Sequence, residues 1–119
     1  MIADRECFEI VSKSLYEESL LLCLDVGDKV AVPGCLEALA CTAAARGEAE
    51  RVATLFGSAQ ALRKATGHHK ASAEQGLREP YLSVARSRLN KAPWKAAFAE
   101  GQAMNIEEFV ECALSERLV

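Results

Sequence analysis

Two adjacent histidines and five cysteines are the side chains of this sequence that could bind a metal ion or supply a nucleophile. The histidines are His68 and His69, and adjacent positions on a regular element cannot easily face one ion. A nucleophilic thiol such as Cys41 would need a histidine base and an orienting acid, and no motif joins those parts. The sequence therefore predicts no metal site, no cofactor and no catalytic residue.

The cysteines are odd in number and show no CxxC pairing. They are Cys7, Cys23, Cys35, Cys41 and Cys112. Such a set is typical of reduced, buried thiols in a cytoplasmic protein. The stretch MIADRECFEI is acidic where a signal peptide needs a basic start, and no apolar run is long enough to span a membrane. We expect a cytoplasmic protein without membrane contact.

The charges divide the chain into an acidic start, a basic middle and an acidic end. Residues 1–29 hold seven acids and three bases, residues 63–95 hold eight bases and two acids, and residues 96–119 hold five acids and one base. A basic middle can bind an anion or an acidic face of a second copy. The residues near Tyr81 and Trp94 that could do so are Arg86, Arg88, Lys91 and Lys95.

Nucleic acid is a weaker expectation for the same four bases. Binding to a nucleic acid needs positive charge together with accessible aromatic groups. The chain as a whole carries a net charge of −3, and Tyr81 and Trp94 stand at the spacing of an apolar helix face. A solvated basic face, or one that meets an acidic protein, is the preferred interpretation.

The scaffold that must position these residues is predicted to be all-α. Alanine occurs 21 times, and β-branched residues are sparse, which favours helix over strand. Apolar residues recur every three or four positions and so mark the inward face of each helix. These inward residues are Phe8, Val11, Leu15 and Leu22; Leu36, Leu39, Ala40 and Ala43; Val52, Leu55, Phe56, Ala59, Leu62 and Thr66; and Phe109, Val110, Ala113 and Leu114.

Glycines and a proline separate the first three helices. Gly27 and Gly47 end the first and second helices, and Gly67 ends a third helix that runs from about residue 48 to residue 66. Glycine suits these ends because it adopts the left-handed conformation without a steric cost. Pro33 suits the first turn of the second helix, where its missing N–H is not needed.

Capping signals and prolines divide the remainder. Ser72–Gln75 has the pattern of a capping box and starts a fourth helix. Pro80 is expected to kink or break that helix, which then resumes over residues 81–89. Pro93 opens another helix that reaches about Gly101. Asn105–Glu108 is a second capping box and starts the final helix.

A self-similarity at a period of 40 residues links LYEESLLLCLDVGD (15–28) to LFGSAQALRKATGH (55–68). Periods of 20 to 50 residues are typical of solenoids. The segment CLEALACTAAARGEAERVATLFGSAQAL resembles a tetratricopeptide repeat, with Ala43 and Val52 as departures from the motif. The positions that fit the motif are Leu36, Leu39, Ala40, Gly47, Phe56 and Ala59.

Residues 35–114 resemble, more narrowly, the C-terminal end of the tetratricopeptide region in large bacterial signal-transduction ATPases, including LuxR-type regulators. The stretches LFGSAQALR and FAEGQAMNIEE carry this likeness. It implies a helical sensor or scaffold part without chemistry of its own, and the sequence contains no P-loop. The resemblance also implies a peptide-binding concave face, formed here by Glu37, Cys41, Ala44 and Ala45. Because this surface is small and nearly uncharged, the preferred interpretation is a face covered by a neighbouring helix or by a second chain.

The predicted architecture is one right-handed helical array. Residues 1–29 form the last helix of an incomplete repeat, residues 30–67 one full hairpin, and residues 71–116 a capping helical tail. Terminal units of such arrays need a polar outer side. The stretch LLLCL at residues 20–24 is apolar nearly all round, so one face of the first helix would be bare.

The predicted function is a non-catalytic protein–protein interaction or scaffold segment of a bacterial signalling or transcriptional regulator. Two copies are expected to cover each other's bare faces in a homodimer. The residues predicted to do so are Leu20, Leu21, Leu22 and Leu24. The alternative is a small stand-alone adaptor whose basic residues 63–95 contact nucleic acid or another anionic partner.

Overall fold

The computed structural model describes the backbone of residues 2–67 and 72–114 and the side chains of residues 13–67 and 79–114. Within these ranges the chain forms six α-helices and no strand, which confirms the all-α prediction. No described helix is long and apolar enough to cross a membrane. The helices are α1 (Ile2–Val26), α2 (Val32–Ala45), α3 (Ala49–Thr66), α4 (Ser72–Arg88), α5 (Lys91–Ala103) and α6 (Ile106–Leu114).

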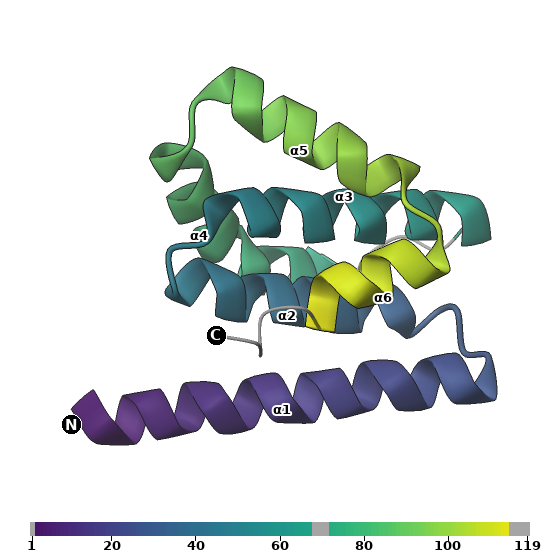
Figure 1. Ribbon diagram of the computed structural model, residues 1–119, viewed down its shortest axis with the longest axis horizontal. Helices are drawn as coiled ribbons and strands as arrows, with labels where there is room; N and C mark the ends of the chain where they lie inside the picture. The colour runs from purple at the N-terminus through teal and green to yellow at the C-terminus, as the bar shows by residue number, and fades with distance from the viewer. Residues whose placement is uncertain (1, 68–71, 115–119) are drawn as a thin grey trace.

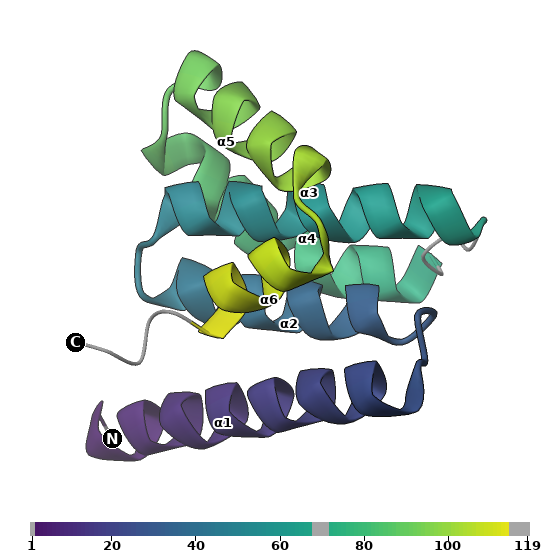
Figure 2. The same cartoon turned by 45° about the vertical axis from the view of Figure 1, so that its right-hand side comes forward.

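Helix α3 is the centre of the molecule and packs against α2, α4, α5 and α6. Helices α1, α2 and α3 run antiparallel and side by side (Figure 1, Figure 2). Helix α4 packs against α2 and α3, and α5 and α6 then cover two further sides of α3. Only α2 contacts α1 extensively among the described helices, so most of the surface of α1 faces away from the other elements.

The predicted helix ends at the three glycines are confirmed. Gly27, Gly47 and Gly67 follow α1, α2 and α3 with φ angles of +76°, +81° and +74°. A residue with a Cβ would be strained in this left-handed region. Pro33 lies in the first turn of α2, as predicted. Each boundary depends on residues within one turn, so the local sequence is enough to place it.

Of the two outcomes expected at Pro80, the break does not occur, because α4 is helical on both sides of this proline. A kink at Pro80 stays a prediction. Glu79, Pro80 and Tyr81 are all exposed, so the proline ring faces solvent rather than the core. Helix α4 does begin at Ser72, but the side chains of the predicted capping box at Ser72–Gln75 lie outside the described residues.

The second capping box is confirmed in full. The Glu108 N–H donates to Asn105 Oδ1, and the Asn105 N–H donates to Glu108 Oε1, both at 2.9 Å. Each side chain thereby satisfies a backbone donor that the first turn of α6 leaves free. Phe109 and Ala113 are buried on the inward side of α6 as predicted.

The inward face of α1 differs from the prediction. Leu15 and Leu22 are 58% and 59% exposed, whereas Leu20 is fully buried and Leu24 packs against the core. The side chains of Phe8 and Val11 lie outside the described residues. The predicted faces of α2 and α3 are correct, since Leu36, Leu39, Val52, Leu55 and Ala59 form the centre of the core, each at most 2% exposed. Helix α1 is apolar on two sides. It packs against α2 with the side that carries Leu20 and Leu24, whereas the apolar periodicity predicted the side that carries Leu15 and Leu22.

Helices α3 and α5 approach each other closely at two glycines. A Cβ on Gly57 would collide with the Phe98 carbonyl, and a Cβ on Gly101 would collide with the Thr54 carbonyl. The buried Ser58 hydroxyl lies at the same crossing, 3.0 Å from the carbonyl oxygen of Gly101. Small residues on both helices thus bring the two backbones together. This contact fixes α5, which carries most of the site described next.

Candidate functional site

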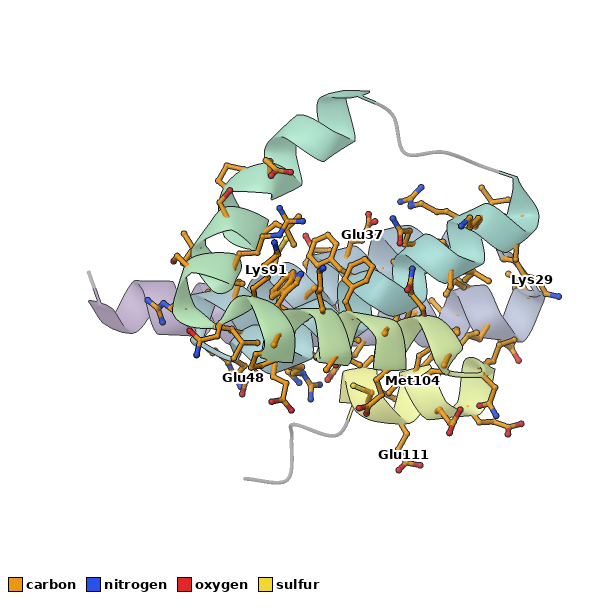
Figure 3. The ribbon with its side chains drawn as sticks, turned by 90° about the horizontal axis from the view of Figure 1, so that it is seen from above. Lys29, Glu37, Glu48, Lys91, Met104 and Glu111 are labelled. Carbon is orange, nitrogen blue, oxygen red and sulfur yellow. The ribbon has the colours of Figure 1, made fainter. Side chains whose placement is uncertain are left out.

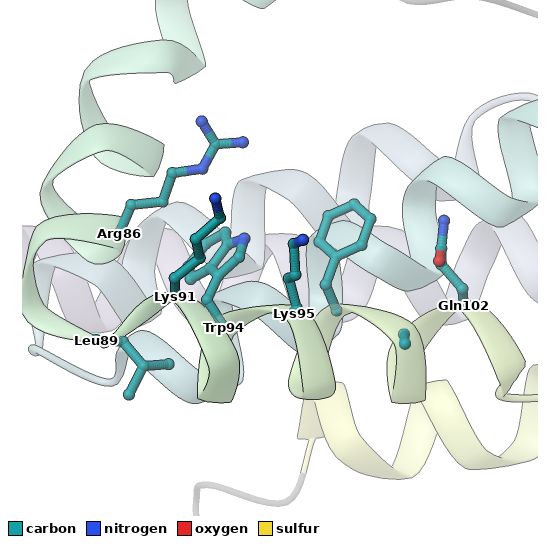
Figure 4. Close-up of a pocket in the computed structure, with 8 residues that line it drawn as sticks. Arg86, Leu89, Lys91, Trp94, Lys95 and Gln102 are labelled. Carbon is teal, nitrogen blue, oxygen red and sulfur yellow. The ribbon is translucent and has the colours of Figure 1, made fainter.

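A groove of about 740 Å³ opens at the corner between α4 and α5. Arg86 enters it from the last turn of α4, Leu89 from the connection, and the other lining residues from α5. Trp94 and Phe98 are its aromatic lining residues, and Trp94 is only 9% exposed. Figure 3 shows the side chains between helices α4 and α5 from above, and Figure 4 shows a close-up of the groove. The lining residues on α5 are Lys91, Trp94, Lys95, Phe98, Ala99 and Gln102.

The order of residues along α5 explains this arrangement. Lys91 and Lys95 are four residues apart, and so are Trp94 and Phe98, which places each pair on one side of the helix. Asn90 has extended backbone angles (φ −63°, ψ 157°) and turns the chain from α4 into α5. The turn brings the Arg86 guanidinium to 5.6 Å from the centre of the Trp94 ring, within the range of a cation–π contact.

Three of the four predicted anion-binding residues meet at this groove. In Figure 4, Arg86, Lys91 and Lys95 extend on the same side of α5 as Trp94. None of these three cations forms an ion pair with another side chain that the structure describes. Cationic groups without a protein carboxylate, beside an apolar surface, make a site for an anion.

Arg88 belongs to a different surface. Two residues along a helix rotate a side chain by about 200°, so Arg88 leaves α4 on the side opposite to Arg86. Its guanidinium lies against Gly47. There it lines a hollow of mixed charge together with Glu48, Arg51 and Glu100. The structure therefore separates Arg88 from the cations of the groove.

The predicted concave face on α2 is largely covered. Glu37 is 2% exposed, and its carboxylate accepts two hydrogen bonds from Arg63 of α3. Ala44 is buried, Cys41 is half-buried and Ala45 is exposed. Helices α1, α3 and α4 all pack against α2. Glu37 thus serves a contact inside the molecule.

No protein family, curated protein or solved structure matches this chain. The assignment of function therefore depends on the surfaces of the molecule itself.

Helix α1 carries more exposed large apolar residues than any other described helix. Leu15, Leu22 and Val26 are 58%, 59% and 75% exposed. They are spaced by seven and four residues, so they lie along one stripe. Of the leucines predicted for self-association, Leu20 is buried inside the molecule and Leu24 is partly buried, whereas Leu21 and Leu22 are exposed. A partner on this face would therefore meet the stripe of Leu15, Leu22 and Val26, which we call the α1 stripe.

The described part of the chain was also compared with the predictions for metal binding and for the cysteines. No group of His, Cys, Asp or Glu there could hold a metal ion. His68 and His69 lie outside the described residues. The described cysteines Cys23, Cys35, Cys41 and Cys112 form no disulfide with one another, and all four are partly exposed rather than fully buried as predicted. Burial raises the pKa of the Cys112 thiol, while Arg51 opposes this effect and Glu100 adds to it.

Sequence reasoning missed Phe98, Ala99 and Gln102 as parts of the groove. A signal for them was present, because Trp94, Phe98 and Gln102 repeat every four residues beside the Lys91 and Lys95 pair. Two parallel stripes of this kind, one apolar and one basic, predict an amphipathic helix face. What they could not predict is that Arg86 of α4 would close the end of that face.

Proposed function

We propose that this chain is a non-catalytic protein–protein interaction segment of a bacterial signalling or transcriptional regulator in the cytoplasm. It self-associates as a homodimer through the α1 stripe. The observation that carries this proposal is the exposure of Leu15, Leu22 and Val26 on the side of α1 opposite to the buried Leu20. A helix that is apolar on opposite sides is normally buried on both.

The energetics favour a covered stripe. Burial of one leucine or valine side chain contributes about 1.5–3 kcal/mol, and each copy in a symmetric pair contributes Leu15, Leu22 and Val26. An isologous contact uses the same patch on both copies, so a single stripe is enough to close a dimer. Val30, just beyond the helix, is half exposed and extends the apolar surface.

The scaffold role is supported by the resemblance to tetratricopeptide arrays and by the antiparallel succession of α1, α2 and α3 (Figure 2). In such arrays each helical hairpin buries its faces on its neighbours, and an uncovered face is an assembly surface. Under this proposal α1 is the outer helix of an incomplete repeat, α2 and α3 form one hairpin, and α4 to α6 form the cap.

Multi-angle light scattering over a micromolar dilution series tests the proposal. We expect the wild type to run at twice the 12.9 kDa chain mass, and the Leu22→Lys variant to run as a monomer. Val84→Lys is the matched control, because Val84 is an exposed apolar residue on a different helix, α4. It should remain dimeric. A monomeric wild type, or a dimer that Leu22→Lys leaves intact, would contradict the proposal.

A second candidate function is an adaptor that contacts nucleic acid or another anionic partner. The cations Arg86, Lys91 and Lys95 favour it, since they have no ion-pair partner among the described side chains. Binding to phosphates releases counterions, so affinity for short DNA should fall steeply between two salt concentrations. Titration with a DNA duplex at low and moderate salt measures this slope. Absence of binding at low salt excludes nucleic acid as the partner.

A further inference from the structure

The groove at the α4–α5 corner has its charge toward one end. Arg86 and Lys91 lie near the connection, where the Arg86 guanidinium lies over Trp94, and Lys95 follows Trp94 along α5 (Figure 4). At the other end, Gln102 Nε2 donates to Gln60 Oε1 at 2.6 Å, so neutral amides close that side. Phe98 and Ala99 lie between these ends on α5. The cations therefore flank Trp94 in the half of the groove near the connection, and the far end is neutral.

The size of the groove suits a small molecule. Ligand pockets commonly measure about 300–1,000 Å³, and this groove measures about 740 Å³. The helix from Lys91 to Gln102 is about 16 Å long, from a rise of about 1.5 Å per residue. A straight hydrocarbon chain can follow that length over Trp94 and Phe98. A nucleic acid would instead need cations spread along a surface to follow its phosphates.

We propose that this groove binds a small amphipathic carboxylate, with its anionic head between Arg86, Lys91 and Lys95 and its unbranched apolar chain along Trp94 and Phe98. The three cations favour a carboxylate, since none of them has an ion-pair partner among the described side chains. The aromatic side chains of Trp94 and Phe98 favour an apolar chain attached to that carboxylate. This inference is independent of self-association, because the α1 stripe is on another helix.

Trp94 makes the site directly observable, because it is the only tryptophan of the chain. Its fluorescence should change saturably when decanoate is added below the concentration at which decanoate forms micelles. Acetate carries the charge without the chain, and decyltrimethylammonium carries the chain with the opposite charge. Neither should produce the change. An equal response to acetate or to decyltrimethylammonium would overturn the proposal.

A pair of double variants locates the charged head. Lys91→Gln/Lys95→Gln should weaken decanoate binding about tenfold, which corresponds to about 1.4 kcal/mol. Lys29→Gln/Lys64→Gln is the matched control, since it removes the same charge from exposed lysines outside the groove. The control should bind decanoate like the wild type. Equal weakening in both variants would show a general charge effect and would overturn the assignment.

A third variant locates the apolar chain. Ala99 is exposed and lines the groove, so Ala99→Phe should fill the space without disturbing the core. We expect it to abolish the saturable fluorescence change while circular dichroism and the unfolding midpoint stay unchanged. Wild-type decanoate binding in Ala99→Phe would overturn the placement of the chain. Loss of decanoate binding together with an intact dimer would separate this site from the α1 stripe.

Discussion

Arg63 of α3 binds both carboxylate oxygens of Glu37 on α2. Its Nε donates to Oε2 at 3.3 Å, and its Nη2 donates to Oε1 at 3.0 Å. The Glu37 side chain is 3% exposed and the Arg63 side chain 15%. A buried charge is tolerated where it is paired and hydrogen-bonded. The two residues thus join the two central antiparallel helices and explain why Glu37 does not face a partner.

Replacement of Arg63 by methionine should destabilise the fold. The variant loses two hydrogen bonds to a charged group, and one such bond contributes about 1.5–3 kcal/mol. We therefore expect the free energy of unfolding to fall by at least about 1.5 kcal/mol, measured by urea denaturation. Lys64→Met is the control at an exposed neighbouring position, and its effect should stay within about 0.5 kcal/mol. Similar losses in the two variants would contradict the structural role of the pair.

The crossing of α3 and α5 should not tolerate a methyl group. Gly101→Ala places a Cβ on the Thr54 carbonyl, and overpacking of this kind costs about 1–3 kcal/mol or more. Gly34→Ala is the control, because nothing lies within 4 Å of a Cβ at that helical position. Alanine should there stabilise α2 by about 0.5–1 kcal/mol. Thermal unfolding of both variants measures the difference, and a neutral Gly101→Ala would disprove the close approach.

Cys112 should make the stability of the protein depend on alkaline pH. Burial raises the pKa of this thiol above its ordinary value of 9.0, so the unfolded chain releases the proton first as the pH rises. The protonated thiol therefore contributes fully to the free energy of unfolding at pH values below the ordinary pKa. This contribution is lost as the pH rises through the pKa of the folded state. Urea midpoints measured from roughly pH 8 to pH 10 should fall more in the wild type than in Cys112→Ala. Parallel pH profiles would exclude this role.

The local sequence determined where the helices begin and end. The left-handed glycines at 27, 47 and 67 and the reciprocal cap of Asn105 and Glu108 were all predictable. Each of these features depends on residues within about one helical turn. The central core of α2 and α3 was also predictable, because its large apolar residues recur every three or four positions along both helices.

The sequence could not select the buried side of α1. Leu15 and Leu22 repeat at helical spacing, but Leu20 and Leu24 offer a second apolar side, and only the contact with α2 chose between them. Periodicity finds an apolar side and does not rank two of them. This choice leaves Leu15, Leu22 and Val26 exposed and so creates the surface on which the proposed dimer depends.

The groove at the α4–α5 corner was also predictable only in part. The sequence by itself determined that Trp94 and Lys95 share one helix and that the chain between residues 63 and 95 is basic. The structure starts that helix two residues before Pro93 and so adds Lys91 to it. The tertiary structure decided that Arg86 joins them while Arg88 turns to Gly47. The reason is that the position of α5 beside the end of α4 depends on the packing of both helices on α3, which lies far away in the sequence.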